Sequence, residues 1–136
     1  MSLQKVLLVD DEQDIRTLVC LILERLGGLQ VRAEASGRDA LAALAEGYVP
    51  DLVLLDVMMP GMDGVQTLAE IRRMPAFRDM PVCFLTAKVH PAELQRWNDL
   101  GINAVLTKPF SPARLVEQIR ECWQEVRQAE ASRRQA

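Results

Sequence analysis

The chain has 136 residues, of which 49% are hydrophobic and 26% are charged, a composition typical of one soluble globular domain. Its net charge of −3 offers no basic surface, so we expect no nucleic-acid partner. The sequence shows neither an apolar run of about 18 residues nor a secretory signal pattern, so we expect no membrane contact and a cytoplasmic location.

The first half of the chain predicts two strands, each followed by a helix. The apolar run 6–9 is the first strand. A helix follows over about 15–26, because its apolar residues recur at steps of three and four and Gly27 provides a stop. The segment 29–33 alternates in polarity, which is typical of an edge strand, and Ser36 is placed to cap the next helix.

The second half repeats this pattern three times. Each repeat is a short continuous apolar run, typical of a strand buried on both faces, followed by an amphipathic helix. The predicted strands are 52–55, 82–85 and 104–106, and the helices after them hold apolar residues over 65–71, 94–100 and 115–126. Residues 129–136 are polar, and we expect them to fray beyond a domain that spans 1–128.

Five strands that alternate with five helices predict an α/β fold. The crossovers should be right-handed, so that helices cover both faces of one parallel sheet. In such a sheet, ligands bind outside the carboxyl ends of the strands. The side chains found at those ends therefore decide what the domain can do.

Polar residues follow four of the five predicted strands. Asp10 and Asp11 follow the first, Asp56 the third, Thr86 the fourth and Lys108 the fifth. These residues are far apart in the sequence, and we expect the fold to bring them into one pocket. The chain has only three lysines against thirteen arginines, and two of the three, Lys88 and Lys108, lie at or just past strand ends.

This set of side chains predicts metal-assisted phosphoryl chemistry. Three neighbouring carboxylates repel one another, and a divalent ion such as Mg²⁺ or Mn²⁺ relieves that repulsion through oxygen ligands. A carboxylate beside the metal can then act as a nucleophile on phosphorus. Lys108 and Thr86 would bind the transferred oxygens. Taken singly, each residue has a plainer interpretation as a surface or turn residue, and Asp11 could also cap the first helix.

The three cysteines do not suggest a metal site. Cys20, Cys83 and Cys122 are widely spaced within apolar patterns, so we interpret them as buried reduced thiols. No Cys-x-x-Cys pair occurs, and His90 is the only histidine, which argues against zinc. His90 precedes a proline in a predicted loop, and we interpret it as a surface residue rather than a phosphohistidine.

Four segments together resemble the receiver domain of two-component response regulators. They are Val6-Leu7-Leu8-Val9-Asp10-Asp11-Glu12, Asp56-Val57-Met58-Met59-Pro60-Gly61-Met62-Asp63-Gly64, Leu85-Thr86-Ala87-Lys88 and Lys108-Pro109-Phe110. The resemblance covers about residues 4–126. Within the family, the chain is similar to a stand-alone chemotaxis receiver. It implies a flavodoxin-like doubly wound (βα)5 fold with strand order 2-1-3-4-5.

The resemblance implies a role for each matched residue at the acidic pocket. Asp56 would be the phosphoacceptor. The metal, Mg²⁺ or Mn²⁺, would be held by Asp10, Asp11, Asp56 and the backbone carbonyl of Met58. The remaining roles fall on residues after the fourth and fifth strands.

Among those residues, Thr86 would move to bind the phosphoryl group, and Lys108 would pair with its oxygens and with Asp56. The family also has a cis peptide bond before the proline, which here is Lys108–Pro109. Ala87 is small, so we expect it to leave the phosphoryl group accessible to water and to donors.

The chain departs from the family pattern at the residue three before the strand-five lysine. Many receivers carry Tyr or Phe there, and the aromatic ring swings inward when the threonine moves. Here the residue is Val105, which cannot make that movement. We hypothesise that Trp97, on the neighbouring helix, fills the space beside Val105 and takes over part of the response; the plainer interpretation is that Trp97 only packs.

The resemblance implies a signalling switch rather than an enzyme. A sensor histidine kinase or a histidine phosphotransfer protein would donate the phosphoryl group, and an output protein, still unidentified, would read the changed surface. A homodimer on phosphorylation is a further possibility. The sequence leaves open whether the chain stands alone or is a fragment of a longer regulator or hybrid kinase.

An enzymatic alternative is an aspartyl-phosphate hydrolase of the haloacid-dehalogenase type. Such enzymes use the same residue types, but place the nucleophile after the first strand in an Asp-x-Asp pattern and usually add a cap domain. Here the best nucleophile follows the third strand, and 136 residues leave no room for a cap.

Overall fold

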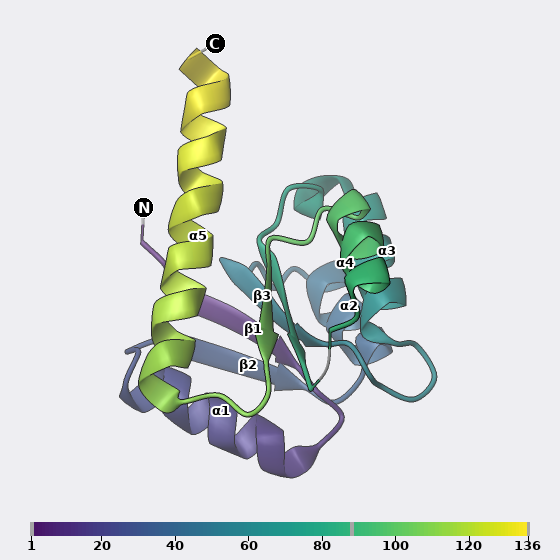
Figure 1. Ribbon diagram of the computed structural model, residues 1–136, viewed down its shortest axis with the longest axis vertical. Coiled ribbons are helices and arrows are strands. Elements are labelled where there is room, and N and C mark those ends of the chain that lie inside the picture. Colours follow the sequence, from purple (N-terminus) through teal and green to yellow (C-terminus); the bar gives the residue numbers. More distant parts are fainter. Residues whose placement is uncertain (1, 88, 136) are drawn as a thin grey trace.

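The computed structural model describes residues 2–87 and 89–135, so Lys88 lies outside the described residues. One five-stranded sheet lies between two layers of helices (Figure 1). Its strands are β1 (Lys5–Val9), β2 (Gln30–Glu34), β3 (Leu52–Asp56), β4 (Val82–Thr86) and β5 (Ala104–Thr107). All neighbours pair in parallel, in the order β2-β1-β3-β4-β5, which confirms the predicted fold and strand order.

Five α-helices alternate with the strands. They are α1 (Gln13–Arg25), α2 (Gly37–Ala45), α3 (Gly64–Arg73), α4 (Pro91–Asp99) and α5 (Pro112–Gln135). A short 3₁₀ helix, η1 (Pro75–Phe77), follows α3. None of the described helices combines the length and apolar character that a bilayer crossing requires.

The core has two halves, one on each face of the sheet. Alternate residues of β1 supply both halves: Val6 and Leu8 face α1 and α5, whereas Leu7 and Val9 face α2, α3 and Trp97 of α4. Both faces of the central strands are therefore covered by apolar side chains. This is why β1, β3 and β4 are continuous apolar runs rather than alternating ones.

The two outer strands are less buried than the central three. The sequence pattern predicted partial burial for β2, but it predicted that the strand at 104–106 is buried on both faces. In the structure β5 occupies the opposite edge of the sheet, and Ala104 and Val105 are only half-buried. Leu18 of α1 and Leu26, the residue just after it, fit the apolar period but are exposed, because the helix presents only Val19, Ile22 and Leu23 fully to the sheet.

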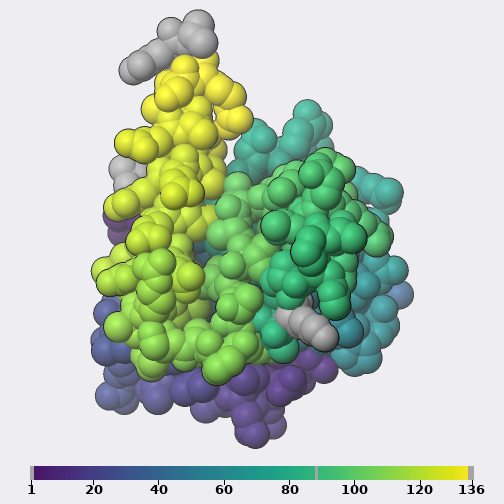
Figure 2. Space-filling model, viewed as in Figure 1, coloured from purple at the N-terminus to yellow at the C-terminus, as the bar shows by residue number. Residues whose placement is uncertain are grey.

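Helix α5 extends further than the sequence predicted. It continues to Gln135, although residues 129–136 were expected to fray, and its last turns stand clear of the rest of the molecule (Figure 2). Two physical features favour this helix. The segment is rich in Ala, Glu, Gln and Arg, which have high helix propensity, and Arg127 pairs with Glu130 at 3.4 Å one turn away.

Candidate functional site

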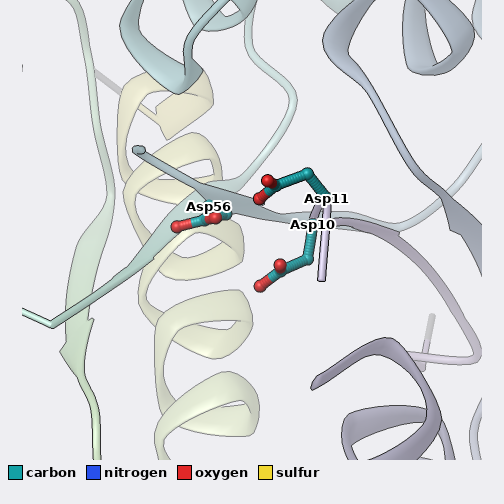
Figure 3. A group of neighbouring side chains, drawn as sticks. All are labelled: Asp10, Asp11 and Asp56. Carbon is teal, nitrogen blue, oxygen red and sulfur yellow. The ribbon is translucent and has the colours of Figure 1, made fainter. Parts of the chain in front are cut away.

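Three carboxylates gather at the carboxyl ends of β1 and β3. The two strands are neighbours and pair Val9 with Leu55, so the next residues, Asp10 and Asp56, lie side by side. Asp11 follows Asp10, and each of the three residues offers a carboxylate oxygen within 4.8 Å of the others (Figure 3). Asp10 is fully buried, Asp56 is 4% exposed and Asp11 is exposed, so the cluster opens to solvent on one side.

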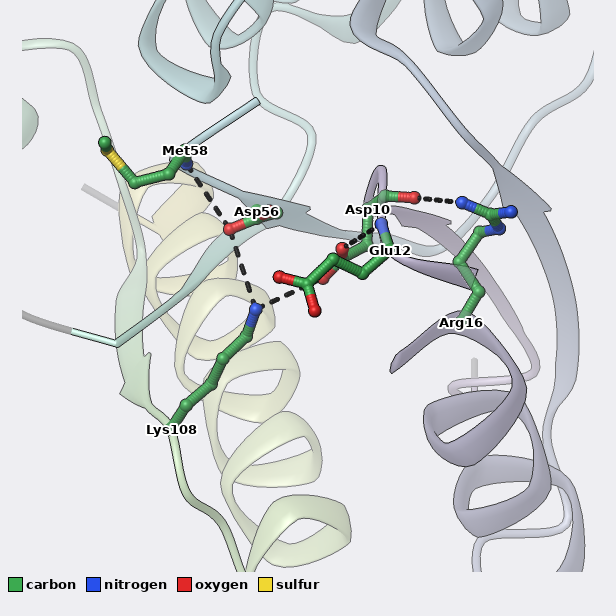
Figure 4. Close-up of polar contacts among 6 residues, drawn as sticks. All are labelled: Asp10, Glu12, Arg16, Asp56, Met58 and Lys108. Carbon is green, nitrogen blue, oxygen red and sulfur yellow. Dashed lines mark hydrogen bonds and ion pairs between the residues drawn. The ribbon is translucent and has the colours of Figure 1, made fainter. Parts of the chain in front are cut away.

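The turn after β1 fixes the Asp10 side chain. Asp10 Oδ1 accepts a hydrogen bond of 2.9 Å from the Glu12 backbone N–H, and Arg16 Nη1 donates to the Asp10 carbonyl oxygen at 2.7 Å (Figure 4). The N-cap of α1 is Glu12, without a side-chain cap, so the expectation that Asp11 caps this helix is wrong. The carboxylate of Asp10 closes the turn instead, and Arg16 is a supporting residue that the motif did not reveal.

Lys108 brings a positive charge to the same place from β5. Its Nζ lies 3.4 Å from Asp10 Oδ2 and 3.8 Å from Asp56 Oδ1 (Figure 4). Only 18% of its side chain is exposed, so water screens these pairs weakly. The Lys108 backbone N–H donates to the Thr86 carbonyl oxygen at 2.8 Å, which ties the end of β5 to β4, and the Lys108–Pro109 peptide bond is cis.

The surroundings of Asp56 disfavour its charged form. Burial and the neighbouring charge of Asp10 raise its pKa from the ordinary 3.8 to about 6. Lys108 and a hydrogen bond of 3.3 Å from the Met58 backbone N–H act in the opposite direction, and Asp11 adds a smaller repulsion. A perturbed carboxyl group beside a charge partner is a feature of functional sites.

Thr86 and Met58 border this carboxylate. The register pairs Asp56 with Leu85, so Thr86 lies one residue further along the neighbouring strand, and it is buried. Met58 follows Asp56 by two residues and points its side chain into solvent. The structure therefore brings all five of the predicted polar residues to one end of the sheet.

Two glycines of the loop after Asp56 serve different purposes. Gly61 has a positive φ of 73°, as expected for a tight turn. Gly64 has no such torsion, but a side chain there would collide with the Asp56 carbonyl oxygen and with Val57. Gly64 therefore allows α3 to pack closely against the end of β3.

A sequence model of the family described as Response regulator receiver domain matches residues 6–120. The chain belongs to the response regulator receiver family. Receivers are phosphoacceptor signalling switches of two-component systems, they bind Mg²⁺ at an acidic pocket, and they interact with histidine kinases and output domains. The haloacid-dehalogenase alternative finds no support among the relatives.

Individual relatives agree with this family. The receiver is 40% identical over 117 residues to the phosphate regulon transcriptional regulatory protein PhoB of Escherichia coli, covering 86% of this chain and 50% of PhoB. It thus spans about half the length of that protein. It is 35% identical to PilG of Pseudomonas aeruginosa over 116 residues, covering 85% of this chain and 84% of PilG.

Solved structures agree as well. The chemotaxis protein CheY4 of Vibrio cholerae superposes with a TM-score of 0.82 at 32% identity, over 89% of this chain and 99% of that one.

The donor set of this receiver fits the metal that the family binds. Three carboxylates within reach of one another supply only oxygen ligands, which is the preference of Mg²⁺. Burial and the repulsion from Asp10 raise the pKa of Asp56, so a cation placed here would relieve an existing repulsion. The exposed side of Asp11 leaves room for water, which Mg²⁺ retains when it binds to proteins.

Aromatic rings occupy the region beside Val105 of this receiver. Val105 pairs in register with Phe84 of β4, and both belong to the same half of the core as Trp97. Trp97 is 1% exposed and meets Phe84 edge-on, with ring centroids 5.1 Å apart at 84°. It is the only residue of α4 that is buried. Trp97 is therefore a core residue of α4, and its position agrees both with a packing role and with the hypothesis that it fills the space beside Val105.

Proposed function

We propose that this receiver accepts a phosphoryl group on Asp56 and signals through the surface formed by α4, β5 and α5. The observation that carries the proposal is the placement of Asp56. Its carboxylate is buried at the end of a central strand, within 4.8 Å of the Asp10 and Asp11 carboxylates and 3.8 Å from the Lys108 ammonium. A surface aspartate would need no such surroundings.

In the proposed reaction an Asp56 carboxylate oxygen forms a bond to phosphorus. The bond from phosphorus to the donor breaks, and the donor is a phosphohistidine of a sensor kinase or of a phosphotransfer protein. Lys108, which already lies beside Asp56, would pair with the transferred oxygens. The Thr86 hydroxyl would donate a hydrogen bond to one of them, from the neighbouring strand end.

The proposed metal ligands are the side chains of Asp10, Asp11 and Asp56 and the backbone carbonyl of Met58. When bound, Mg²⁺ or Mn²⁺ would neutralise negative charge on the carboxylates and on the phosphoryl oxygens. The protein supplies the position of these groups. Asp10 is held by the Glu12 N–H and by Arg16, and Asp56 by the Met58 N–H.

The proposed switch runs from Thr86 to α4. Phosphorylation can bias the domain only by interacting more favourably with one of its two conformations. Movement of Thr86 and Ala87 at the end of β4 would disturb Phe84, which meets Trp97 edge-on beside Val105. Because Trp97 is the one residue of α4 that is buried, a shift of its ring would change the position of that helix.

The partners follow from this scheme. We propose a sensor histidine kinase or a histidine phosphotransfer protein as the donor and a protein that binds the altered α4–β5–α5 surface as the output, with homodimerisation on phosphorylation as one form of output. We also propose action in the cytoplasm, the compartment in which three unpaired cysteines are ordinarily kept reduced.

Acetyl phosphate labelling tests the proposed acceptor. The wild-type chain with Mg²⁺ should gain about 80 Da, one HPO₃ group, in an intact-mass spectrum. Asp56→Asn should gain none, and chelation of the metal should abolish the gain in the wild type. Asp99→Asn is the matched control, because Asp99 is an exposed aspartate of α4 away from the site. Equal labelling of Asp56→Asn and the wild type would place the acceptor elsewhere.

A further inference from the structure

Two of the three cysteine sulfurs meet inside the domain. Cys83 is the second residue of β4 and is fully buried, and Cys122 lies on the inner face of α5 with 3% of its surface exposed. Cys83 Sγ donates a hydrogen bond to Cys122 Sγ at 2.9 Å. A disulfide bond is about 2.05 Å long, so an approach of about 0.9 Å would join the two sulfurs.

The contact joins elements that are distant in sequence. Thirty-nine positions separate the two cysteines, and the packing of α5 on the sheet brings them together within the half of the core shared with α1. Cys20, by contrast, lies on α1 and is partly exposed. The pairing is therefore specific to Cys83 and Cys122.

We propose that Cys83 and Cys122 form a reversible disulfide bond when the protein meets a peroxide, tying α5 to β4. In reducing compartments, disulfides are usually transient and often sense oxidants. The proposal concerns a modification site distinct from the acidic pocket, and it does not depend on phosphorylation of Asp56.

Cys122 is the sulfur placed to react first. It lines an open groove of about 400 Å³ between the β4–β5 side of the sheet and the outer half of α5, whereas Cys83 has no exposed surface. The hydrogen bond from Cys83 lowers the pKa of the Cys122 thiol, against the opposing effects of burial and Glu125. The same hydrogen bond, followed by burial, raises the pKa of Cys83 well above its ordinary value. Thiolate character, which governs attack on peroxides, is thus concentrated on the cysteine that lines the groove.

The chemistry balances with hydrogen peroxide as the oxidant. The Cys122 thiolate attacks one peroxide oxygen, the O–O bond breaks, and the other oxygen leaves as hydroxide, which takes up the proton that Cys122 released to become water. The sulfenic acid on Cys122 is then attacked by Cys83 sulfur. The S–S bond forms as the S–O bond breaks, and the departing hydroxide takes the Cys83 proton and leaves as a second water. Two thiols are oxidised and one peroxide is reduced.

Thiol counting on the full chain tests the proposal. A Cys20→Ser background leaves Cys83 and Cys122 as the only cysteines. The native protein is treated with hydrogen peroxide, unfolded and alkylated with N-ethylmaleimide. The untreated sample should take up two labels and the treated sample none, and dithiothreitol should restore both. A tryptic digest of the treated sample should contain the Cys83 and Cys122 peptides as one cross-linked species.

Three results would overturn the proposal. They are retention of both labels after peroxide treatment, loss of label that dithiothreitol does not restore, and a cross-link between two chains in place of one within a chain. Thermal unfolding gives a second readout on the same samples. A bond that closes the segment between Cys83 and Cys122 restricts the unfolded chain, so the oxidised protein should unfold at a higher temperature. An oxidised sample with an unchanged midpoint would contradict the expected tie between α5 and β4.

Discussion

Asp56→Asn should stabilise the metal-free protein at neutral pH, although it removes the proposed acceptor. The substitution replaces a carboxylate that is buried beside Asp10 with a neutral group of similar size. In the folded wild type the pKa of Asp56 is about 6, whereas in the unfolded chain it is near 3.8. The folded state therefore binds the Asp56 proton more tightly than the unfolded state does.

The size of the effect follows from those two values. A tenfold difference in proton affinity corresponds to 1.36 kcal/mol, so the gap between 3.8 and about 6 corresponds to about 3 kcal/mol at most. Below the unfolded pKa both states are protonated, and wild type and Asp56→Asn should differ little. As pH rises from about 4 to 6, the free energy of unfolding of the wild type should fall relative to that of Asp56→Asn, because Asp56 ionises more readily in the unfolded chain. Above pH 7 the difference between the two proteins should be constant.

Urea unfolding of both proteins at a series of pH values, with EDTA and with excess Mg²⁺, measures this difference. Comparing the two proteins at each pH cancels the titration of shared groups that lie away from the site. Mg²⁺ should stabilise the wild type more than Asp56→Asn, because it compensates the repelling carboxylates. A metal-free wild type that is as stable as Asp56→Asn at pH 7.5, or a gap that widens toward acid pH, would refute this electrostatic reasoning.

Four further substitutions, of which Trp123→Ala is a control for Trp97→Ala, probe the framework of the site and the switch. Lys108→Met should raise the pKa of Asp56 further and lower the free energy of unfolding by about 1.5–3 kcal/mol at pH 7.5. Carbon-13 NMR titration of the carboxyl groups measures that pKa, and an unchanged pKa would count against the ion pair. Gly64→Ala should lower the free energy of unfolding, measured in urea, by about 1–3 kcal/mol, because the added methyl group collides with the Asp56 carbonyl oxygen. Alanine has a higher helix propensity than glycine, so a variant that is more stable than the wild type would contradict this prediction. Trp97→Ala should cost about 3–5 kcal/mol, and Trp123→Ala less because Trp123 is only half-buried; equal losses would argue against Trp97 as the anchor of α4.

Much of the fold was predictable because the apolar pattern is set by burial. The strands β1, β3 and β4 are covered on both faces, and their sequences are accordingly short continuous apolar runs. The pattern failed where burial is partial. Leu18 and Leu26 keep the helical period of α1 but face solvent, and a sequence cannot show how far a helix is rotated against its sheet.

The gathering of the site residues was predictable from topology, but their detailed surroundings were not. Asp10 and Asp56 follow neighbouring parallel strands, and Lys108 follows β5 at the edge of the same sheet and reaches them with its long side chain. The support from Arg16 and the contact of Cys83 with Cys122 depend on side-chain positions across separate elements. The end of the last helix was predicted too early, because the polar composition after residue 128 was taken as a sign of fraying. Those residues favour helix, and Glu130 pairs with Arg127 one turn earlier.

The most direct test of the central claim is to identify which residue carries the phosphoryl group. Borohydride reduces an acyl phosphate to an alcohol, so an aspartyl phosphate becomes homoserine that peptide mass spectrometry can locate. After treatment with acetyl phosphate and Mg²⁺, homoserine should occur at residue 56 and should be absent when EDTA replaces the metal. Homoserine at residue 10, 11 or 63, or at residue 56 regardless of the metal, would contradict a metal-dependent acceptor built around Asp56.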